Sequence, residues 1–114
     1  LIANLGSMNG KQLLSEKIIE NAFKQQIIGH DLVLDKLVRW GIGFGLPVDN
    51  DSWMGYFNNE DTCYWTGWGG SLSIADRRNK VSFGYAPIKM DVDVFGEERT
   101  NTIVKALVQS IDDL

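Results

Sequence analysis

One short segment, residues 64–71, constrains the fold of this chain more than any other. It reads Tyr-Trp-Thr-Gly-Trp-Gly-Gly-Ser, so three large aromatic residues and three glycines fall within eight positions. Glycine beside large aromatic side chains indicates that another group approaches the backbone closely, because glycine has no Cβ to obstruct it. The flat aromatic side chains would wall the space. We therefore expect this segment to border a substrate-binding site.

Alternating apolar residues predict three strands. From residue 37 to residue 46 every second position is apolar, with glycines between several of them. Residues 63–75 form a second predicted strand and residues 80–86 a third, joined by a tight turn at residues 76–79. Residues 27–37 alternate only loosely and fit either a loop or a short strand. The polar, turn-rich stretch 49–61 is expected to be a surface loop.

Two helices are predicted beside these strands. Ser15 is a suitable N-cap for a helix over residues 16–26, whose apolar residues fall on one face. A second helix is expected over residues 97–113, where apolar residues recur at intervals of three and four. Residues 1–5 resemble the last turn of a helix closed by Gly6. The sequence thus predicts an α+β fold, with a three-stranded antiparallel sheet packed against both helices.

Composition excludes several classes of function. The 114 residues include 44% hydrophobic and 23% charged residues, which is ordinary for one globular domain. A net charge of −4 argues against a nucleic-acid partner, and Arg77, Arg78 and Lys80 are expected to be solvated in a turn. No apolar run is long enough to span a membrane. With one cysteine and one histidine, no disulfide, metal site or cofactor is expected, and Cys63 is expected to be buried or half-buried.

Four fragments, taken in order, resemble the serine β-lactamase and penicillin-binding-protein superfamily, in its esterase-like family VIII branch. They include the strand Trp40-Gly41-Ile42-Gly43-Phe44-Gly45 and the segment Trp68-Gly69-Gly70-Ser71 with Ala75-Asp76. The others are Gly10-Lys11-Gln12-Leu13-Leu14-Ser15 and Phe83-Gly84-Tyr85. The resemblance implies that residues 1–114 are the C-terminal part of a single β-lactamase-like domain, without its N-terminal strands and helical subdomain.

The resemblance also implies a chemistry. A serine of the family attacks an ester or amide, and two backbone N–H groups hold the oxyanion of the acyl intermediate. On this chain the matching strand N–H is that of Ser71, and the substrate-binding positions are Trp65, Trp68, Gly69 and Gly70. Trp68 stands where penicillin-recognising members have lysine. An apolar wall there favours a small neutral ester over a β-lactam acid.

The chain departs from the family pattern at several positions. It contains no Ser-x-x-Lys, since Ser15 is followed by lysine only two positions later. Trp65 stands where many esterase-like members have histidine, and Ile88 stands where they often have asparagine. Tyr56-Phe57-Asn58 spells the family's Tyr-x-Asn motif at a position that indicates coincidence. This chain alone is therefore not expected to carry out the family's chemistry.

Three interpretations follow from these residues. In the first, the chain is the C-terminal portion of a longer serine hydrolase and supplies its oxyanion strand and pocket wall. In the second, it is a non-catalytic relative with a structural or interaction role. In the third, it is a binding module for a sugar or peptide, with an aromatic platform formed by Trp53, Tyr64, Trp65 and Trp68. The same side chains would otherwise fill a core.

The first interpretation predicts how residues 1–114 behave when they are produced alone. A sheet that lacks its first two strands exposes an unpaired edge and an apolar face, so the chain should self-associate through that edge or form a loosely packed state. Light scattering and thermal unfolding measure this. A monomer with a sharp, cooperative unfolding transition would count against the interpretation.

Overall fold

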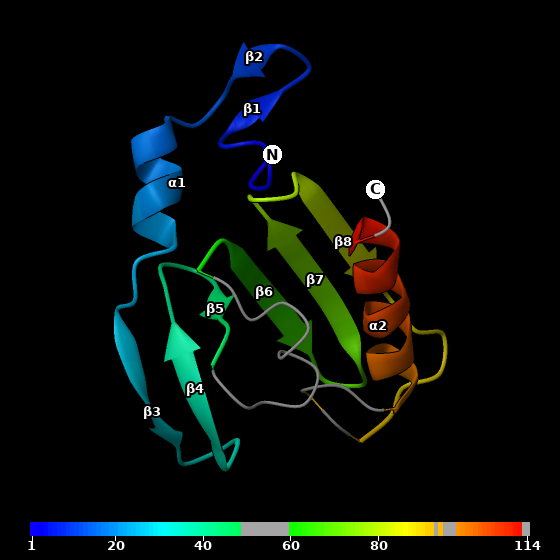
Figure 1. Ribbon diagram of the computed structural model, residues 1–114. Coiled ribbons are helices and arrows are strands. Elements are labelled where there is room, and N and C mark those ends of the chain that lie inside the picture. The colour runs from blue at the N-terminus through cyan, green and yellow to red at the C-terminus, as the bar shows by residue number, and fades with distance from the viewer. Residues whose placement is uncertain (49–59, 93, 95–97, 113–114) are drawn as a thin grey trace.

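The structure is a computed structural model, and it describes residues 1–48, 60–92, 94 and 98–112. The predicted loop 49–61 falls almost wholly outside the described residues, as do Trp53 and the Tyr56-Phe57-Asn58 motif. The described part is α+β, as the sequence predicts. Strands are numbered β1 to β8 and helices α1 and α2 in Figure 1.

The main sheet has six antiparallel strands, and each pairs with the next in chain order, from β3 to β8. Its strands are β3 Ile27–Asp31, β4 Lys36–Trp40, β5 Gly45–Leu46, β6 Thr62–Gly67, β7 Ser71–Asp76 and β8 Val81–Tyr85. A separate two-stranded hairpin is formed by β1 Ser7–Met8 and β2 Lys11–Gln12. Because each strand pairs with the next one along the chain, the sheet is built from contacts between strands that are consecutive in sequence (Figure 1).

The predicted strand over residues 37–46 is wrong, because the chain reverses within it. The structure has β4, a tight turn, and then β5 lying antiparallel to β4, with Trp40 opposite Gly45. Gly43 lies in the left-handed region with φ +78°. The Gly41 N–H donates to the Phe44 carbonyl at 2.9 Å, which closes the turn. The alternating pattern therefore belongs to a hairpin rather than to one strand.

The predicted strand over residues 63–75 is also wrong, for the same physical reason. Gly69 and Gly70 have φ values of +92° and +94°, which a residue with a side chain rarely adopts, and the chain turns back there. The result is two strands, β6 and β7. The ambiguous stretch after residue 26 adds β3. These differences turn the expected three-stranded sheet into a six-stranded one.

Both predicted helices exist, with different bounds. Helix α1 spans Glu16–Ala22, and the Ile18 N–H donates to the Ser15 hydroxyl at 3.3 Å, as expected of an N-cap. It ends four residues earlier than predicted because the chain must extend to enter β3. Helix α2 spans Glu98–Asp112. Residues 1–6 have the two hydrogen bonds that close the last turn of a helix, from the Gly6 N–H to the Leu1 carbonyl at 3.0 Å and from the Leu5 N–H to the Ile2 carbonyl at 3.1 Å. Leu5, at φ +51°, takes the left-handed position before Gly6, which lies at φ +86°.

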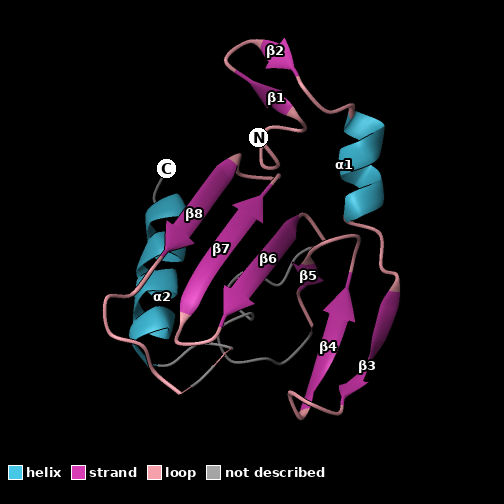
Figure 2. Ribbon diagram, turned by 180° about the vertical axis from the view of Figure 1, so that it is seen from behind, coloured by secondary structure: helices cyan, strands magenta, loops and turns pink. Residues whose placement is uncertain are grey.

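Side chains from the sheet enter two separate cores. Helix α2 covers one face, where Val104 packs against Val38, Tyr64, Leu72 and Ile74. The second core joins Ile19 and Phe23 of α1 to Leu46 and Cys63. Since successive side chains of a strand point to opposite faces, β6 sends Tyr64 into one core and Cys63 into the other. Figure 2 shows the sheet from the side away from α2.

The sheet ends in two strands that each pair on one side only, β3 and β8. Large apolar residues at the β3–β4 hairpin are exposed, including Leu32 and Val33 in the turn. These are the edges through which the expected self-association would occur, and that expectation stays a prediction. No helix among the described residues combines the length and apolar character that crossing a bilayer requires.

The close approach of β5 and β6 gives a prediction for stability. The Tyr64 ring lies directly over Gly45, so a methyl group added at Gly45 would overlap the ring, whereas one at Gly84 in β8 meets open space. Gly45→Ala should lower the free energy of unfolding by about 1–3 kcal/mol, as overpacking of a core does. Urea unfolding followed by tryptophan fluorescence measures this. Gly84→Ala is the matched control, and an equal effect of both variants would contradict the packing argument.

Candidate functional site

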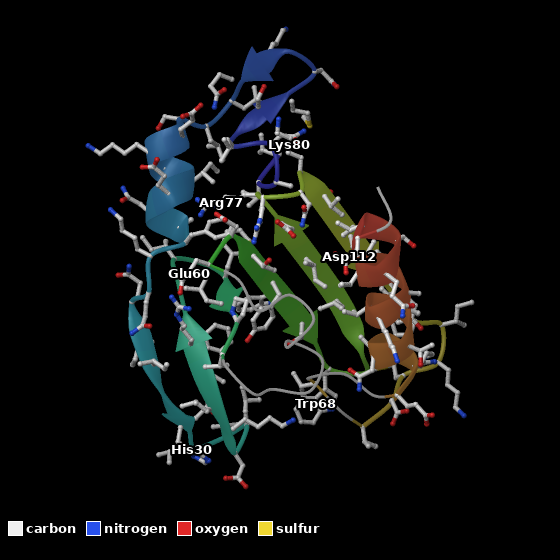
Figure 3. All side chains as sticks on the ribbon, viewed as in Figure 1. His30, Glu60, Trp68, Arg77, Lys80 and Asp112 are labelled. Atoms are coloured by element: carbon white, nitrogen blue, oxygen red, sulfur yellow. The ribbon has the colours of Figure 1, made fainter. Side chains whose placement is uncertain are left out.

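The glycine-rich segment forms the turn between β6 and β7, at one end of the sheet. Trp68, Gly69 and Gly70 make up this β6–β7 turn, Gly67 ends β6, and Ser71 begins β7. Figure 3 shows Trp68 at this end and Arg77 and Lys80 at the opposite end. The basic residues of the β7–β8 turn therefore lie far from the candidate site.

Backbone hydrogen bonds define the shape of the β6–β7 turn. The Gly70 N–H donates to the Gly67 carbonyl at 3.1 Å, and Ser71 faces Gly67 as the last pair of the ladder. The Ser71 hydroxyl lies against the Gly67 α-carbon, in the space that a side chain at residue 67 would occupy. Within the described part of the chain, the Trp68 N–H makes no hydrogen bond. The turn thus holds a backbone donor that is free to meet a ligand.

The two glycines of the turn are buried, because segments from much later in the sequence cover them. Met90 side-chain atoms lie 2.9–3.0 Å from the position that a Cβ of Gly69 would take, and the Asp91 N–H donates to the Gly69 carbonyl at 3.3 Å. The Thr100 hydroxyl of α2 donates to the Gly70 carbonyl at 3.4 Å. The glycines thus accommodate the chain's own segments, and nothing in the sequence pattern signals these partners.

The two tryptophan side chains of the site are exposed. Trp68 is 68% exposed on the turn, and Trp65 of β6 is 54% exposed. The ring of Trp65 lies 5.8 Å from that of Trp40, centroid to centroid, at an interplanar angle of 48°. Trp40 of β4 thus packs against Trp65. The two residues are 25 positions apart, so the alternation of apolar residues along one strand does not predict this contact. Tyr64 is only 3% exposed, so it cannot belong to a surface platform.

A pocket of about 190 Å³ opens beside Trp65 and Cys63 of β6. Its lining includes Ile2, Phe44, Cys63, Trp65, Ser73 and Ser82. The residues of the β6–β7 turn do not line it. The structure thus places Trp65 at the pocket, and Trp68, Gly69, Gly70 and Ser71 outside it, at the end of the hairpin away from the Cys63–Ala75 pair.

Arg77 is not solvated as expected, because its side chain is only 16% exposed and has structural partners. Arg77 stacks over the Phe23 ring at 3.9 Å from its centroid and pairs with Asp61 at 2.9 Å, which ties α1 to the sheet. His30 lies 3.4 Å from Asp35 at the β3–β4 turn, on the surface. Among the described residues, no three His, Cys, Asp or Glu side chains are grouped to hold a metal ion.

Comparison with solved structures identifies close structural neighbours. A family VIII carboxylesterase superposes with a TM-score of 0.83 over 95% of this chain, at 30% sequence identity. A penicillin-binding-protein homolog from Caulobacter crescentus superposes with a TM-score of 0.84 over 96% of this chain, at 29% identity. The chain spans only 28% and 29% of the length of these two proteins. No model of a protein family and no curated protein matches.

Cys63, which lines the pocket, gives a prediction about reactivity. Burial raises the pKa of its thiol from an ordinary 9.0 to about 12, although the nearby Arg77 guanidinium opposes the rise. The thiol is therefore neutral at pH 8 and a poor nucleophile. A thiol-reactive chromogenic disulfide should leave the folded protein unmodified at pH 8 and react at once with protein unfolded in guanidinium.

The same raised pKa fixes the direction of a pH effect on stability. The fold favours the neutral thiol, so its contribution to stability is complete below pH 9 and is lost as the pH rises towards 12.

For the reactivity prediction, rapid modification of the folded protein at pH 8 would show instead that Cys63 is accessible and ionised. Because Cys63 is the only cysteine, any signal is assigned to it without ambiguity.

Proposed function

Since this chain has the β-lactamase-like fold of the two neighbours, we propose that it is the C-terminal segment of a longer serine hydrolase of the esterase or acyl-transfer type. The observation that carries the proposal is a superposition over 95% of the chain, at 30% identity, with a carboxylesterase of which it spans 28%. A nucleophilic serine with its lysine, and a tyrosine, would come from the part of the protein outside these residues. The substrate would be a small ester or amide.

In this proposal the β6–β7 turn supplies one backbone N–H of the oxyanion hole. Ser71 is the position implied by the family resemblance, and its N–H stands at the start of β7, where the turn ends. An oxyanion needs donors that are already fixed before charge develops, because reorienting them would cost free energy during the reaction. A turn held by buried contacts on its carbonyl side meets that need.

The structure supports a second candidate donor in the same turn. The Trp68 N–H follows directly after β6 and is without a hydrogen bond in the described part of the chain, whereas Ser71 takes part in the ladder with Gly67. Its peptide is oriented by the Gly67 carbonyl, which accepts from Gly70 at 3.1 Å. The N–H of Ser71 or that of Trp68 could stabilise the oxyanion, and the proline and alanine variants described below decide between them.

Trp65 and Trp68 would form the apolar wall of the substrate site. Their exposed fractions, 54% and 68%, leave large ring surfaces open to a ligand. A wall of this kind favours a neutral acyl group over a carboxylate-bearing one, because no cation is placed at Trp68 to receive the charge. The proposal therefore names neutral esters as substrates.

A non-catalytic protein with the same fold is the alternative proposal. It is supported by the absence of Ser-x-x-Lys from the 114 residues and by the apolar side chains left exposed near the β3 edge. Under this alternative the unpaired edges of β3 and β8 would mediate self-association.

The first experiment is the intact mass of the protein as its source makes it, with sequencing of its N-terminal peptide and an assay with p-nitrophenyl acetate. The hydrolase proposal expects a protein longer than 114 residues that carries Ser-x-x-Lys and hydrolyses the ester. A natural start at or near Leu1, without hydrolysis, would favour the non-catalytic alternative.

Substitutions that remove one backbone N–H then identify the oxyanion donor. In the native protein, Ser71→Pro is compared with Ser71→Ala, and Trp68→Pro with Trp68→Ala, so that each pair isolates the N–H from the side chain. Loss of one oxyanion donor should lower kcat by about 100- to 1,000-fold. The donor is the residue whose proline variant shows this loss relative to its alanine variant. If neither pair does, the turn is not part of the oxyanion hole.

A further inference from the structure

We propose that Thr100 of α2, together with Met90, is a positioning residue that holds the β6–β7 turn in the geometry its backbone donors require. Neither residue lies in the glycine-rich segment. The inference rests on the proposed function for its catalytic meaning, while its structural part can be measured without any activity.

The turn needs restraint from outside itself. Two successive glycines at φ +92° and +94° have more conformational freedom than any other pair of residues. From within, the turn is closed by the hydrogen bond from the Gly70 N–H to the Gly67 carbonyl and by the pairing of Gly67 with Ser71 at the end of the ladder. The Gly69 and Gly70 carbonyls are held from outside the turn, which restrains the N–H groups of the same peptides.

The Thr100 hydroxyl supplies this restraint at the end of the turn. It is 2% exposed and donates to the Gly70 carbonyl at 3.4 Å. The Gly70 carbonyl and the Ser71 N–H belong to one planar trans peptide, in which the two groups point in opposite directions. Holding the carbonyl towards α2 therefore holds the Ser71 N–H away from α2.

Met90 and Asp91 act on the preceding peptide in the same way. The Asp91 N–H donates to the Gly69 carbonyl at 3.3 Å, and this carbonyl shares its peptide plane with the Gly70 N–H. The Met90 side chain lies against Gly69, within 3.0 Å of the position of an added Cβ. Two consecutive peptides are thus held on their carbonyl side by Met90, Asp91 and Thr100, while their N–H groups face away from these residues.

The burial of Thr100 explains why this hydrogen bond matters although it is long. Once α2 docks, neither the hydroxyl nor the Gly70 carbonyl can turn to water, so losing the donor leaves a buried acceptor unsatisfied. Val104, one helical turn further along α2, is fully buried in the main core. The docking of α2 therefore fixes the place of the Thr100 hydroxyl.

The test uses the native protein, labelled with ¹⁵N, and three variants of α2. Thr100→Val removes the hydroxyl and keeps the branched shape, whereas Thr100→Ser keeps the hydroxyl. Thr102→Val is the matched control, because Thr102 is exposed on the same helix and its hydroxyl donates to the Glu98 carbonyl instead of the turn. Amide hydrogen exchange at Gly70 and Ser71 is measured in each, together with kcat and KM for p-nitrophenyl acetate.

Thr100→Val should speed exchange at Gly70 and Ser71 about tenfold, as expected for the loss of one hydrogen bond, with Thr100→Ser and Thr102→Val within twofold of the parent. It should lower kcat about tenfold or more and leave KM within twofold, since Thr100 holds the Gly70–Ser71 peptide, whose N–H acts on the oxyanion of the transition state. Met90→Ala, at a position that is 66% exposed, should give a smaller change in the same direction.

Unchanged exchange at the turn in Thr100→Val and in Met90→Ala overturns the inference, whatever the activity. Faster exchange with unchanged kcat overturns the catalytic role of Thr100. If Thr100→Val does not fold, Met90→Ala decides by the same two readouts. If the parent protein hydrolyses no ester, the proposed function fails, and exchange alone then decides whether Thr100 holds the turn.

Discussion

The rest of the structure depends on the pairing of β6 with β7. The ladder of this hairpin runs through six residue pairs, from Thr62 opposite Asp76 to Gly67 opposite Ser71. Alternate side chains of this ladder enter the core under α2 and the core against α1, so the hairpin contributes to both groups of apolar residues. At its far end Asp76 accepts hydrogen bonds from the backbone of Arg78 and Asn79, which fixes the turn into β8. At its near end lies the candidate site.

The sequence allowed the fold class, both helices and the existence of the β7–β8 hairpin to be predicted, because these depend on local patterns. Ser15 caps α1 as expected, and the period of α2 matches its buried side. The strands were predicted too long. An alternating pattern is the same in one strand and in a hairpin whose turn preserves the alternation, so periodicity cannot locate the reversals at Gly43 and at Gly69-Gly70.

The candidate site could be located but not built from the sequence. Glycines beside tryptophans correctly indicated close approach to the backbone, yet the approaching groups are Met90 and Thr100 of the same chain. Contacts of this kind join residues far apart in sequence, and neither methionine nor threonine carries a signal for them. Trp65 and Trp68 were expected to face a ligand, and both are exposed. Whether they contact a substrate stays a proposal.

The contact between Thr100 and Gly70 also determines the order in which the hairpin and the candidate site form. Thirty residues separate Thr100 from Gly70, so the β6–β7 ladder can form while the end of the chain is still being made, but its turn cannot reach its final shape then. During synthesis on the ribosome, the turn stays unrestrained until α2 has emerged and docked onto the sheet. The local hairpin forms early and the site at its tip last, so a partly made chain has the sheet before it has an ordered site.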